Sequence, residues 1–290
     1  MGRQAQAAGA VRRGQTWHAM RHNSGVLIGG TIVLVTVVIA IFAPLLAPAD
    51  PYVTNPAQAL LPPGSPGHIL GTCELGQDMA SRLIYGSRLS LGIGFVAALL
   101  ASTTGLLLGT VSGFFGGWLD AVIMRIMDIM LSFPYILLAI VIVAILGPGL
   151  VNTLMAVAVL GIPFYVRVVR AAVLSIKDQE YVQAARVIGC SNGRIIFRTI
   201  VPNVISPVIT AFSIDVGWLI LEAASLSFLG LGAQPPTAEW GAMLASSRQY
   251  FILAPHVALL PGICIFVLVL GCNLFGDGLR DALDPRLRSR

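Results

Sequence analysis

The sequence predicts an all-α membrane protein with six transmembrane helices, and two observations support this fold class. Hydrophobic residues make up 56% of the chain, charged residues only 11%, and the mean hydropathy is +0.85, values far from those of a soluble domain. Six stretches of roughly 20 mainly apolar residues follow one another, which is the length a helix needs to cross the hydrocarbon core. Lipid cannot satisfy the backbone groups of an open sheet edge, so each span should be helical.

The first predicted span covers residues 26–47 and follows a basic amino-terminal tail, residues 1–25. A cleaved signal peptide is the alternative, because Arg residues precede the span and Ala47-Pro48-Ala49 has the small residues of a cleavage site. The apolar stretch is 22 residues long, whereas that of a signal peptide has about 7 to 15. A permanent transmembrane helix is the favoured interpretation.

An outer-side loop, residues 48–88, is expected next. Its six prolines between residues 48 and 66 disfavour regular structure there. Apolar residues then recur at helical spacing, which predicts an amphipathic helix on the outer face of the membrane leading into the second span. A plain connector is the alternative. The residues of this helical pattern are Leu75, Met79, Leu83 and Ile84.

Residues 89–280 are expected to form a core of five helices, whose ends are marked by glycines and prolines. The predicted spans are residues 89–115, 123–146, 150–174, 204–232 and 257–275. Glycines recur every four residues near the end of the first of these, so they line one helix face and allow another backbone to approach closely. This packing surface, within the subunit or against a partner, consists of Gly105, Gly109, Gly113 and Gly117.

Ionisable residues and a proline inside the spans leave alternatives open. Arg125 and Asp128 lie three apart, so a local ion pair is expected, with a proton relay through Asp128 as the alternative. Pro163 should kink the fourth span, either as a static bend or as a hinge during gating. Asp215 and Glu222 lie seven apart on one face, deep in the fifth span. They either pair with donors of a neighbouring helix or line a polar path for a substrate.

The distribution of basic residues predicts the orientation of the chain. Fifteen Arg and Lys residues lie in the two tails, at the start of the third span and around the connection between the fourth and fifth spans. Only Arg82, Arg88 and Arg248 lie on the opposite side. Because basic residues favour the cytoplasmic side, both tails, residues 1–25 and 281–290, should be cytoplasmic. The net charge of +5 then reflects topology and attraction to anionic lipid, with no need for nucleic acid.

The connection between the fourth and fifth spans predicts two short helices joined by a glycine turn, residues 177–201. The first helix has an apolar stripe of Tyr181, Ala184, Ala185 and Ile188, whose small alanines allow close approach by a soluble partner. The spacing also fits a DNA-binding helix-turn-helix, but anchorage between two spans leaves little room to enter a major groove. Ser191 should cap the second helix and Pro202 should end it. The predicted docking residues are Glu180, Tyr181, Gln183, Ala184, Ala185, Arg186, Gly189, Arg194 and Pro202.

Catalytic, metal and cofactor sites are not indicated by the sequence. The four cysteines and four histidines are scattered, so neither a disulfide framework, a zinc site nor a catalytic constellation is predicted. The phosphate-binding pattern Gly-x-x-x-x-Gly-Lys-Ser/Thr is missing from the sequence, so ATP chemistry would need another chain.

The cytoplasmic connection resembles that of the inner-membrane permeases of bacterial ATP-binding-cassette importers. Their pattern is written EAA, three residues, Gly, nine residues, Ile, one residue, Leu-Pro. It stands here as Gln183-Ala184-Ala185, Gly189, Thr199 and Val201-Pro202. Gln183, Thr199 and Val201 depart from the pattern, whereas the alanines, the glycine and the proline keep their spacing. The resemblance implies the type I importer permease fold and an ATPase as the docking partner, with Gln183 offering no charge for a salt bridge.

Three further motifs resemble the second of the two unlike membrane subunits in dipeptide, oligopeptide and glutathione importers. Residues 71–78 resemble the pattern Gly-Thr-Asp-x-Leu-Gly-Arg-Asp of that group, with Cys73 and Gln77 as departures. Residues 226–241 and 273–285 match the group closely. The resemblance implies a heterodimer with a second permease, two cytoplasmic ATPase subunits that use ATP and Mg²⁺, and a periplasmic solute-binding protein. Import across the bacterial inner membrane would proceed by alternating access.

Two other functions stay open at this point. A self-sufficient, ion-coupled secondary transporter would need coupling residues and an internal repeat, for which Asp215 and Glu222 are slender support. The same type of complex could also import nickel complexes or another solute that is not a peptide, because the binding protein selects the substrate.

Overall fold

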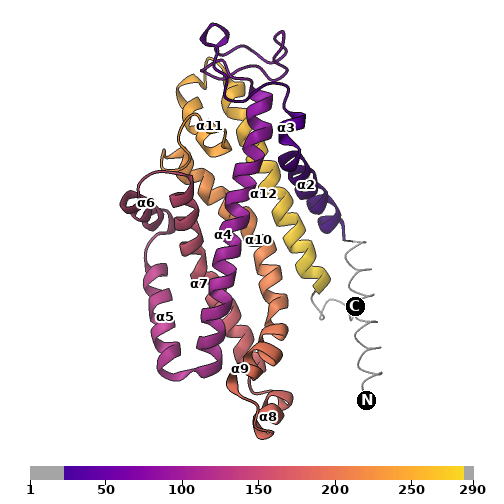
Figure 1. The fold of residues 1–290 in the computed structure, drawn as a ribbon, viewed down its shortest axis with the longest axis vertical. Helices are drawn as coiled ribbons and strands as arrows, with labels where there is room; N and C mark the ends of the chain where they lie inside the picture. Colours follow the sequence, from indigo (N-terminus) through magenta and orange to yellow (C-terminus); the bar gives the residue numbers. More distant parts are fainter. Residues whose placement is uncertain (1–22, 284–290) are drawn as a thin grey trace.

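The computed structural model describes residues 23–283, which form an elongated helical bundle (Figure 1). Five of its helices are long and apolar enough to cross a membrane, and a bent pair makes up to six. The all-helical prediction is confirmed for the described residues, which contain only two isolated β-bridges and no strand. The long helices are α2 (Ser24–Ile41), α4 (Met79–Phe115), α7 (Leu150–Ile176), α10 (Val201–Phe228) and α12 (Pro255–Leu283).

Shorter elements connect these helices and gather at the two ends of the bundle (Figure 1). The loop of residues 48–78 and α11 lie at one end, and α8 and α9 lie at the other. The short elements are α3 (Ala43–Leu46), η1 (Pro56–Gln58), α5 (Gly117–Ser132), α6 (Tyr135–Leu146), α8 (Glu180–Val187), α9 (Asn192–Ile195), the π-helical turn η2 (Ile196–Ile200), α11 (Trp240–Ser247) and η3 (Arg248–Tyr250).

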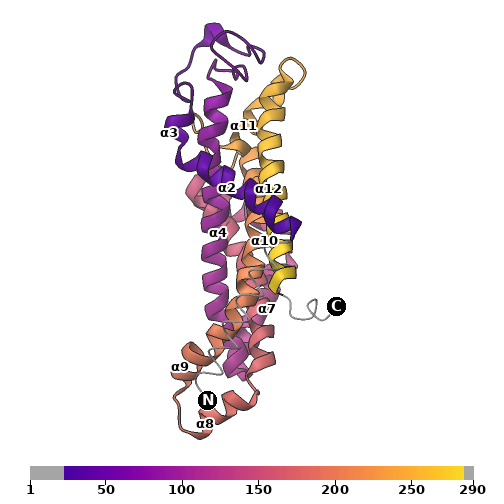
Figure 2. The same ribbon diagram turned by 90° about the vertical axis from the view of Figure 1, so that its right-hand side faces the viewer.

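The bundle is centred on α4, which packs along α7 and also contacts α10. Helix α10 in turn packs against α7 and α12, while α2 packs against α12 at the edge of the bundle (Figure 2). The main apolar core includes Ala97, Leu219, Ile220 and Leu268, all nearly or fully buried. Small residues such as Ala97 let these helices approach closely, as expected for helix packing in lipid.

The predicted interfacial helix is not a separate element. Leu75 lies in the loop, and the rest of the pattern forms the first turns of α4. Asp78 sets the start of α4, since its Oδ2 atom accepts hydrogen bonds from both the backbone N and the Oγ of Ser81 at 2.8 Å. The second span therefore begins ten residues earlier than predicted, at Met79 instead of residue 89.

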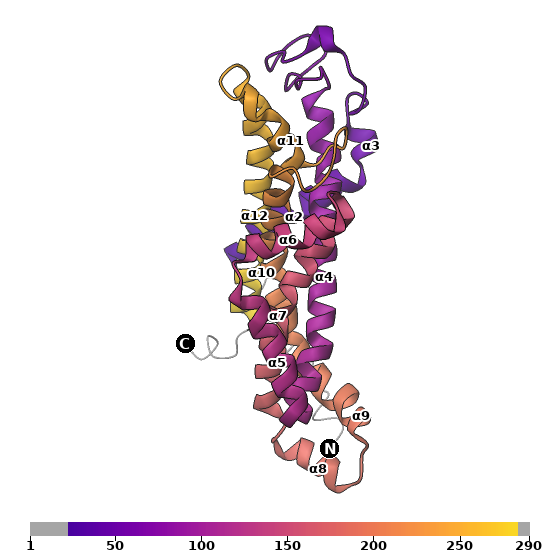
Figure 3. The same ribbon diagram turned by 90° about the vertical axis from the view of Figure 1, so that its left-hand side faces the viewer.

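The third span is also different from the prediction, because α5 and α6 meet at an angle of 97°. Phe133 has φ −93° and ψ 142°, the extended conformation that a following proline imposes, and Pro134 occupies the cap of α6. The break turns α6 across the long axis of the bundle (Figure 3). Helix α5 begins at Gly117 instead of residue 123.

Pro202 does not end the second short helix as predicted. Helix α9, the turn η2 and α10 form one continuous helical run, in which Pro202 occupies the first turn of α10. The π-helical turn directly precedes it. Such a turn widens the helix, and this accommodates a proline that lacks an N–H and whose ring crowds the preceding turn.

Candidate functional site

The two short helices α8 and α9 form a protruding unit at one end of the bundle (Figure 1). Gly189 ends α8 as predicted, in the left-handed conformation with φ +81°. Its N–H donates to the carbonyl of Arg186 and the N–H of Cys190 donates to that of Ala185, both at 3.0 Å. This pair of bonds is the Schellman motif, which satisfies two carbonyls at the helix end. Ser191 caps α9 by accepting a hydrogen bond from the backbone N of Arg194 at 3.4 Å.

Buried apolar side chains anchor this unit to the long helices. Val182 from α8, Ile195 from α9 and Ile200 from η2 are at most 1% exposed. They belong to a cluster that includes Phe114 at the end of α4 and Val173 near the end of α7. The short helices are therefore closely packed against the ends of α4 and α7.

The outward face of the same unit is apolar and exposed. Val187 is 86% exposed, Ile188 77% and Phe197 69%. Tyr181 and Ile188 of the predicted apolar stripe also face outward, as a docking surface requires, whereas the buried anchor Val182 was not predicted. Of the other predicted docking residues, Ala185 is half-buried, and Glu180, Gln183, Ala184, Arg186, Gly189, Arg194 and Pro202 are exposed.

The glycine stripe of α4 packs against α7 within the subunit. A Cβ atom at Gly105 would lie 2.2 Å from the Cβ of Tyr165, and one at Gly109 would lie 2.7 Å from the Cβ of Val169. Gly113 makes the equivalent approach to Val173, at 2.8 Å. Gly117 is a correction to the predicted stripe, because it lies beyond the end of α4 and opens α5, with no atom near its Cβ position.

Two ion pairs join α5 to α7. Asp128 pairs with Arg167 at 2.7 Å, which corrects the predicted local pair with Arg125. Asp120 forms a bidentate pair with Arg170, with distances of 2.6 Å to Nε and 2.7 Å to Nη2. Such fork-shaped pairing holds the relative orientation of the two helices. The exposed fractions are about half for the first pair but only 30% and 21% for Arg170 and Asp120.

Replacing Arg170 with glutamine is expected to loosen α5 from α7. The loss should be about 1 kcal/mol in the free energy of unfolding, the upper part of the range for partly exposed pairs. Thermal unfolding of the purified chain in detergent would measure it, and Arg125→Gln is the matched control, since Arg125 is exposed. Equal midpoints for the two variants would contradict a structural role for the Asp120–Arg170 pair.

A cavity of about 340 Å³ lies beside the middle of α10. Asp215 from α10 and Tyr135 from α6 line it, and Tyr165 from α7 is fully buried nearby. The Oδ2 atom of Asp215 and the hydroxyls of both tyrosines are buried without a hydrogen bond of ordinary length, although the Tyr165 hydroxyl is close enough to the Asp215 carboxylate to interact with it. Buried polar groups normally find partners, so this constellation is suited to water or a polar solute.

Glu222 is half-buried on the same helix but does not line this cavity. Its charge and that of Asp215 both act on the Tyr135 hydroxyl. Neither acid forms an ion pair with another residue between positions 23 and 283, and the donor that α7 offers to Asp215 is the hydroxyl of Tyr165. The two tyrosines were missed by the sequence analysis because only tertiary packing brings them to Asp215.

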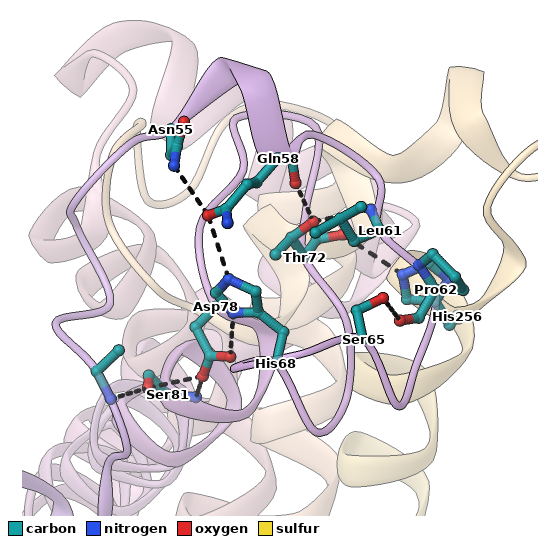
Figure 4. Close-up of polar contacts among 11 residues, drawn as sticks. Asn55, Gln58, Leu61, Pro62, Ser65, His68, Thr72, Asp78, Ser81 and His256 are labelled. Atoms are coloured by element: carbon teal, nitrogen blue, oxygen red, sulfur yellow. Dashed lines mark hydrogen bonds and ion pairs between the residues drawn. The ribbon is translucent and has the colours of Figure 1, made fainter.

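A polar network orders the loop of residues 48–78 at the opposite end of the bundle from α8 and α9 (Figure 4). His68 Nδ1 lies 3.0 Å from Asp78 Oδ1, so the capping residue of α4 also holds the loop. The hydroxyl of Thr72 donates to the carbonyl of Gln58 at 2.5 Å, and His256 Nε2 lies 3.4 Å from the carbonyl of Thr72. These contacts connect the loop to the starts of both α4 and α12.

Comparisons with known proteins place this architecture among transport systems. Residues 105–289 match the family described as the binding-protein-dependent transport system inner membrane component. Residues 13–63 match the N-terminal TM domain of oligopeptide transport permease C.

Two relatives illustrate the similarity over nearly the whole chain. The dipeptide transport system permease protein DppC of Alkalihalophilus pseudofirmus is 48% identical, over 95% of this chain and 90% of the relative. The glutathione transport system permease protein GsiD of Escherichia coli is 44% identical, over 94% of this chain and 90% of the relative.

Solved structures show that the fold is shared more widely. A chain of the MetNI methionine ABC transporter in an inward-facing conformation matches with a TM-score of 0.57 at 22% identity, covering 70% of this chain and 96% of that one. An amino acid ABC transporter matches with a TM-score of 0.53 at 16% identity, covering 72% and 94%. The chain therefore belongs to the family of binding-protein-dependent transport system inner membrane components, the permease subunits of ATP-binding-cassette importers.

Proposed function

We propose that this permease moves dipeptides, oligopeptides or glutathione inward by alternating access, driven by ATPases on separate chains. The names of the relatives support this class of substrate, since they include dipeptide and glutathione transport permeases. The orientation we propose puts α8, α9 and both tails in the cytoplasm of a bacterial inner membrane. The excess of basic residues on that side supports it.

The exposed apolar face of α8 and α9 is the observation that carries the proposal. Val187, Ile188 and Phe197 would lose much exposed apolar surface against a partner, and the cluster around Val182 connects that partner rigidly to α4 and α7. Each of two ATPase subunits would bind one permease of a heterodimer through this face. ATP and Mg²⁺ would bind to the ATPases, and a periplasmic solute-binding protein would deliver the solute to the outer loop.

The cavity at Asp215 is proposed as part of the translocation path. It lies midway along the bundle, and buried polar groups without partners from α6 and α10 line it, which suits a polar solute passing through in steps. Glu222 would continue this polar face toward the outer end of α10.

Removing the charge of Asp215 is expected to slow uptake by about tenfold, as lost hydrogen bonds to a solute commonly do. The measurement is the initial rate of dipeptide uptake by proteoliposomes containing Asp215→Asn. Glu222→Gln is the comparison, with a smaller loss expected because Glu222 lies outside the cavity lining. Unchanged uptake by Asp215→Asn would remove this acid from the path.

The function as a whole is tested by reconstitution of both permeases, both ATPases and the binding protein. Uptake of a labelled dipeptide should require ATP and the binding protein, and this chain alone should hydrolyse no ATP. Uptake driven by a proton gradient without ATP would contradict the proposal and favour a secondary transporter.

A further inference from the structure

A second polar cavity, of about 230 Å³, lies at the outer end of the bundle. It is enclosed by the start of α4, the segment between α10 and α11, and α11 itself, and it shares no lining residue with the cavity at Asp215. Its lining includes the charged residues Glu74 and Arg82 and the polar residues Gln77 and Ser227.

Arg82 is the residue that calls for explanation. This residue is only 7% exposed. Its Nη1 donates to three neutral acceptors, which are the side chain of Gln77 and the carbonyls of Pro51 and Pro236. Its Nε has no partner, and no carboxylate of the described residues lies within ion-pair distance. Glu74 lines the same cavity but does not contact Arg82, and a buried cation with no counter-ion in contact is costly, so the cavity is suited to an anionic group beside Arg82.

The two positions that depart from the family pattern lie beside Arg82, since Gln77 accepts a hydrogen bond from it. Cys73 and Gln77 replace an acidic and a basic residue, and the structure puts the Sγ of Cys73 3.4 Å from the Oε1 of Gln77. The two departures are therefore in contact. Burial raises the pKa of the Cys73 thiol, which stays neutral and supplies no negative charge.

Two further unpartnered atoms define the kind of ligand. The hydroxyl of Ser227, a residue 2% exposed, and the Oε2 atom of Glu74 are both buried without a partner. Glu74 would repel a simple anion but would attract an ammonium group. The volume is below the roughly 300 to 1,000 Å³ of pockets for larger ligands, which limits the occupant to a small molecule.

We propose that this outer cavity binds a zwitterion of amino-acid size, with its carboxylate toward Arg82 and Ser227 and its ammonium toward Glu74. The ligand chemistry is that of a free amino acid or of a short peptide with both termini charged. The site is distinct from the proposed path and needs no ATP.

Calorimetric titration of the assembled transporter in lipid nanodiscs, without ATP and without the binding protein, tests this site. The probes are L-alanine, L-alanyl-L-alanine, acetate and methylammonium. At least one of the two zwitterions should bind saturably and at least about tenfold more tightly than acetate or methylammonium, because each of those satisfies only one of the two charges. Preference between L-alanine and L-alanyl-L-alanine identifies the source of the ligand.

Variants test whether the zwitterion binds in this cavity or elsewhere on the surface. Arg82→Gln should weaken binding about tenfold or more, and Arg88→Gln is its control because Arg88 is exposed on the same helix. Because Arg82 also supports the loop, Ala245→Leu provides a second test that fills the cavity and breaks no hydrogen bond. Ala57→Leu, at an exposed position of η1, is its control.

The proposal is overturned if neither zwitterion binds, if acetate binds as tightly as they do, or if Ala245→Leu leaves binding unchanged. It is also overturned if a side chain of a partner subunit fills the cavity in the assembled transporter. Failure here would leave ATP-driven uptake intact, whereas failure of the proposed transport function would leave the titration unaffected, so the two outcomes can be distinguished.

Discussion

Replacing Gly189 with valine is expected to lower ATP-driven uptake by about tenfold or more, because it disturbs the unit proposed to dock the ATPase. Gly189 has φ +81°, which lies in the left-handed region. This conformation costs a residue with a side chain roughly 1 to 2 kcal/mol of conformational energy, and it costs a β-branched residue more. No atom lies within 4 Å of its Cβ position, so the effect is purely one of backbone conformation. The turn would relax and shift α8 relative to α9. The measurements are dipeptide uptake and co-purification of the ATPases.

Gly193 provides the matched control for this experiment. A Cβ atom at Gly193 would also meet no atom within 4 Å, but its backbone is that of the right-handed helix α9. Gly193→Val should therefore retain nearly full uptake. Gly189→Asn should retain most of it, since asparagine tolerates the left-handed conformation. Equal activity of Gly189→Val and Gly193→Val would show that the turn geometry is not needed for coupling.

The membrane spans were predictable because their signal is local and strong. Long apolar stretches bounded by glycine and proline predicted the starts of α2, α7 and α12 to within about two residues. The predicted ends were less accurate, since α2 ends about six residues earlier and α12 about eight residues later than predicted. The break between α5 and α6 also has a local cause, the dipeptide Phe133-Pro134. It was missed because the apolar residues continue on both sides of this dipeptide. Composition therefore predicted a single straight span where the backbone is sharply bent.

The polar sites were less predictable because their members come from different helices. Spacing alone suggested a pair between Arg125 and Asp128, but tertiary packing gave Asp128 the better-placed Arg167. Spacing identified Asp215 as unusual but could not show that Tyr135 and Tyr165 lie nearby. The departures at Cys73 and Gln77 were visible in the sequence, whereas their contact was not.

Gly105→Ala is expected to destabilise the permease more than any other single methyl addition to the glycine stripe. The new Cβ would lie 2.2 Å from the Cβ of Tyr165, whereas carbon atoms in contact lie about 3.5 to 4.0 Å apart. Because the opposing atoms include the α7 backbone at 3.1 Å, no rotamer change relieves the clash, and α4 and α7 must separate. Overpacking commonly costs about 1 to 3 kcal/mol, and the upper end is expected here.

A graded series on the same helix makes this prediction sharp. The expected order of destabilisation, measured by unfolding in mixed detergent micelles, is Gly105→Ala first, then Gly109→Ala and Gly113→Ala, whose closest contacts are 2.7 and 2.8 Å. Gly92→Ala is the control, because its Cβ position is open and alanine favours the helix by about 1 kcal/mol. Gly92→Ala should therefore match or exceed the stability of the unmodified chain. If Gly105→Ala were as stable as the unmodified chain, the close approach of α4 and α7 at Gly105 would be contradicted.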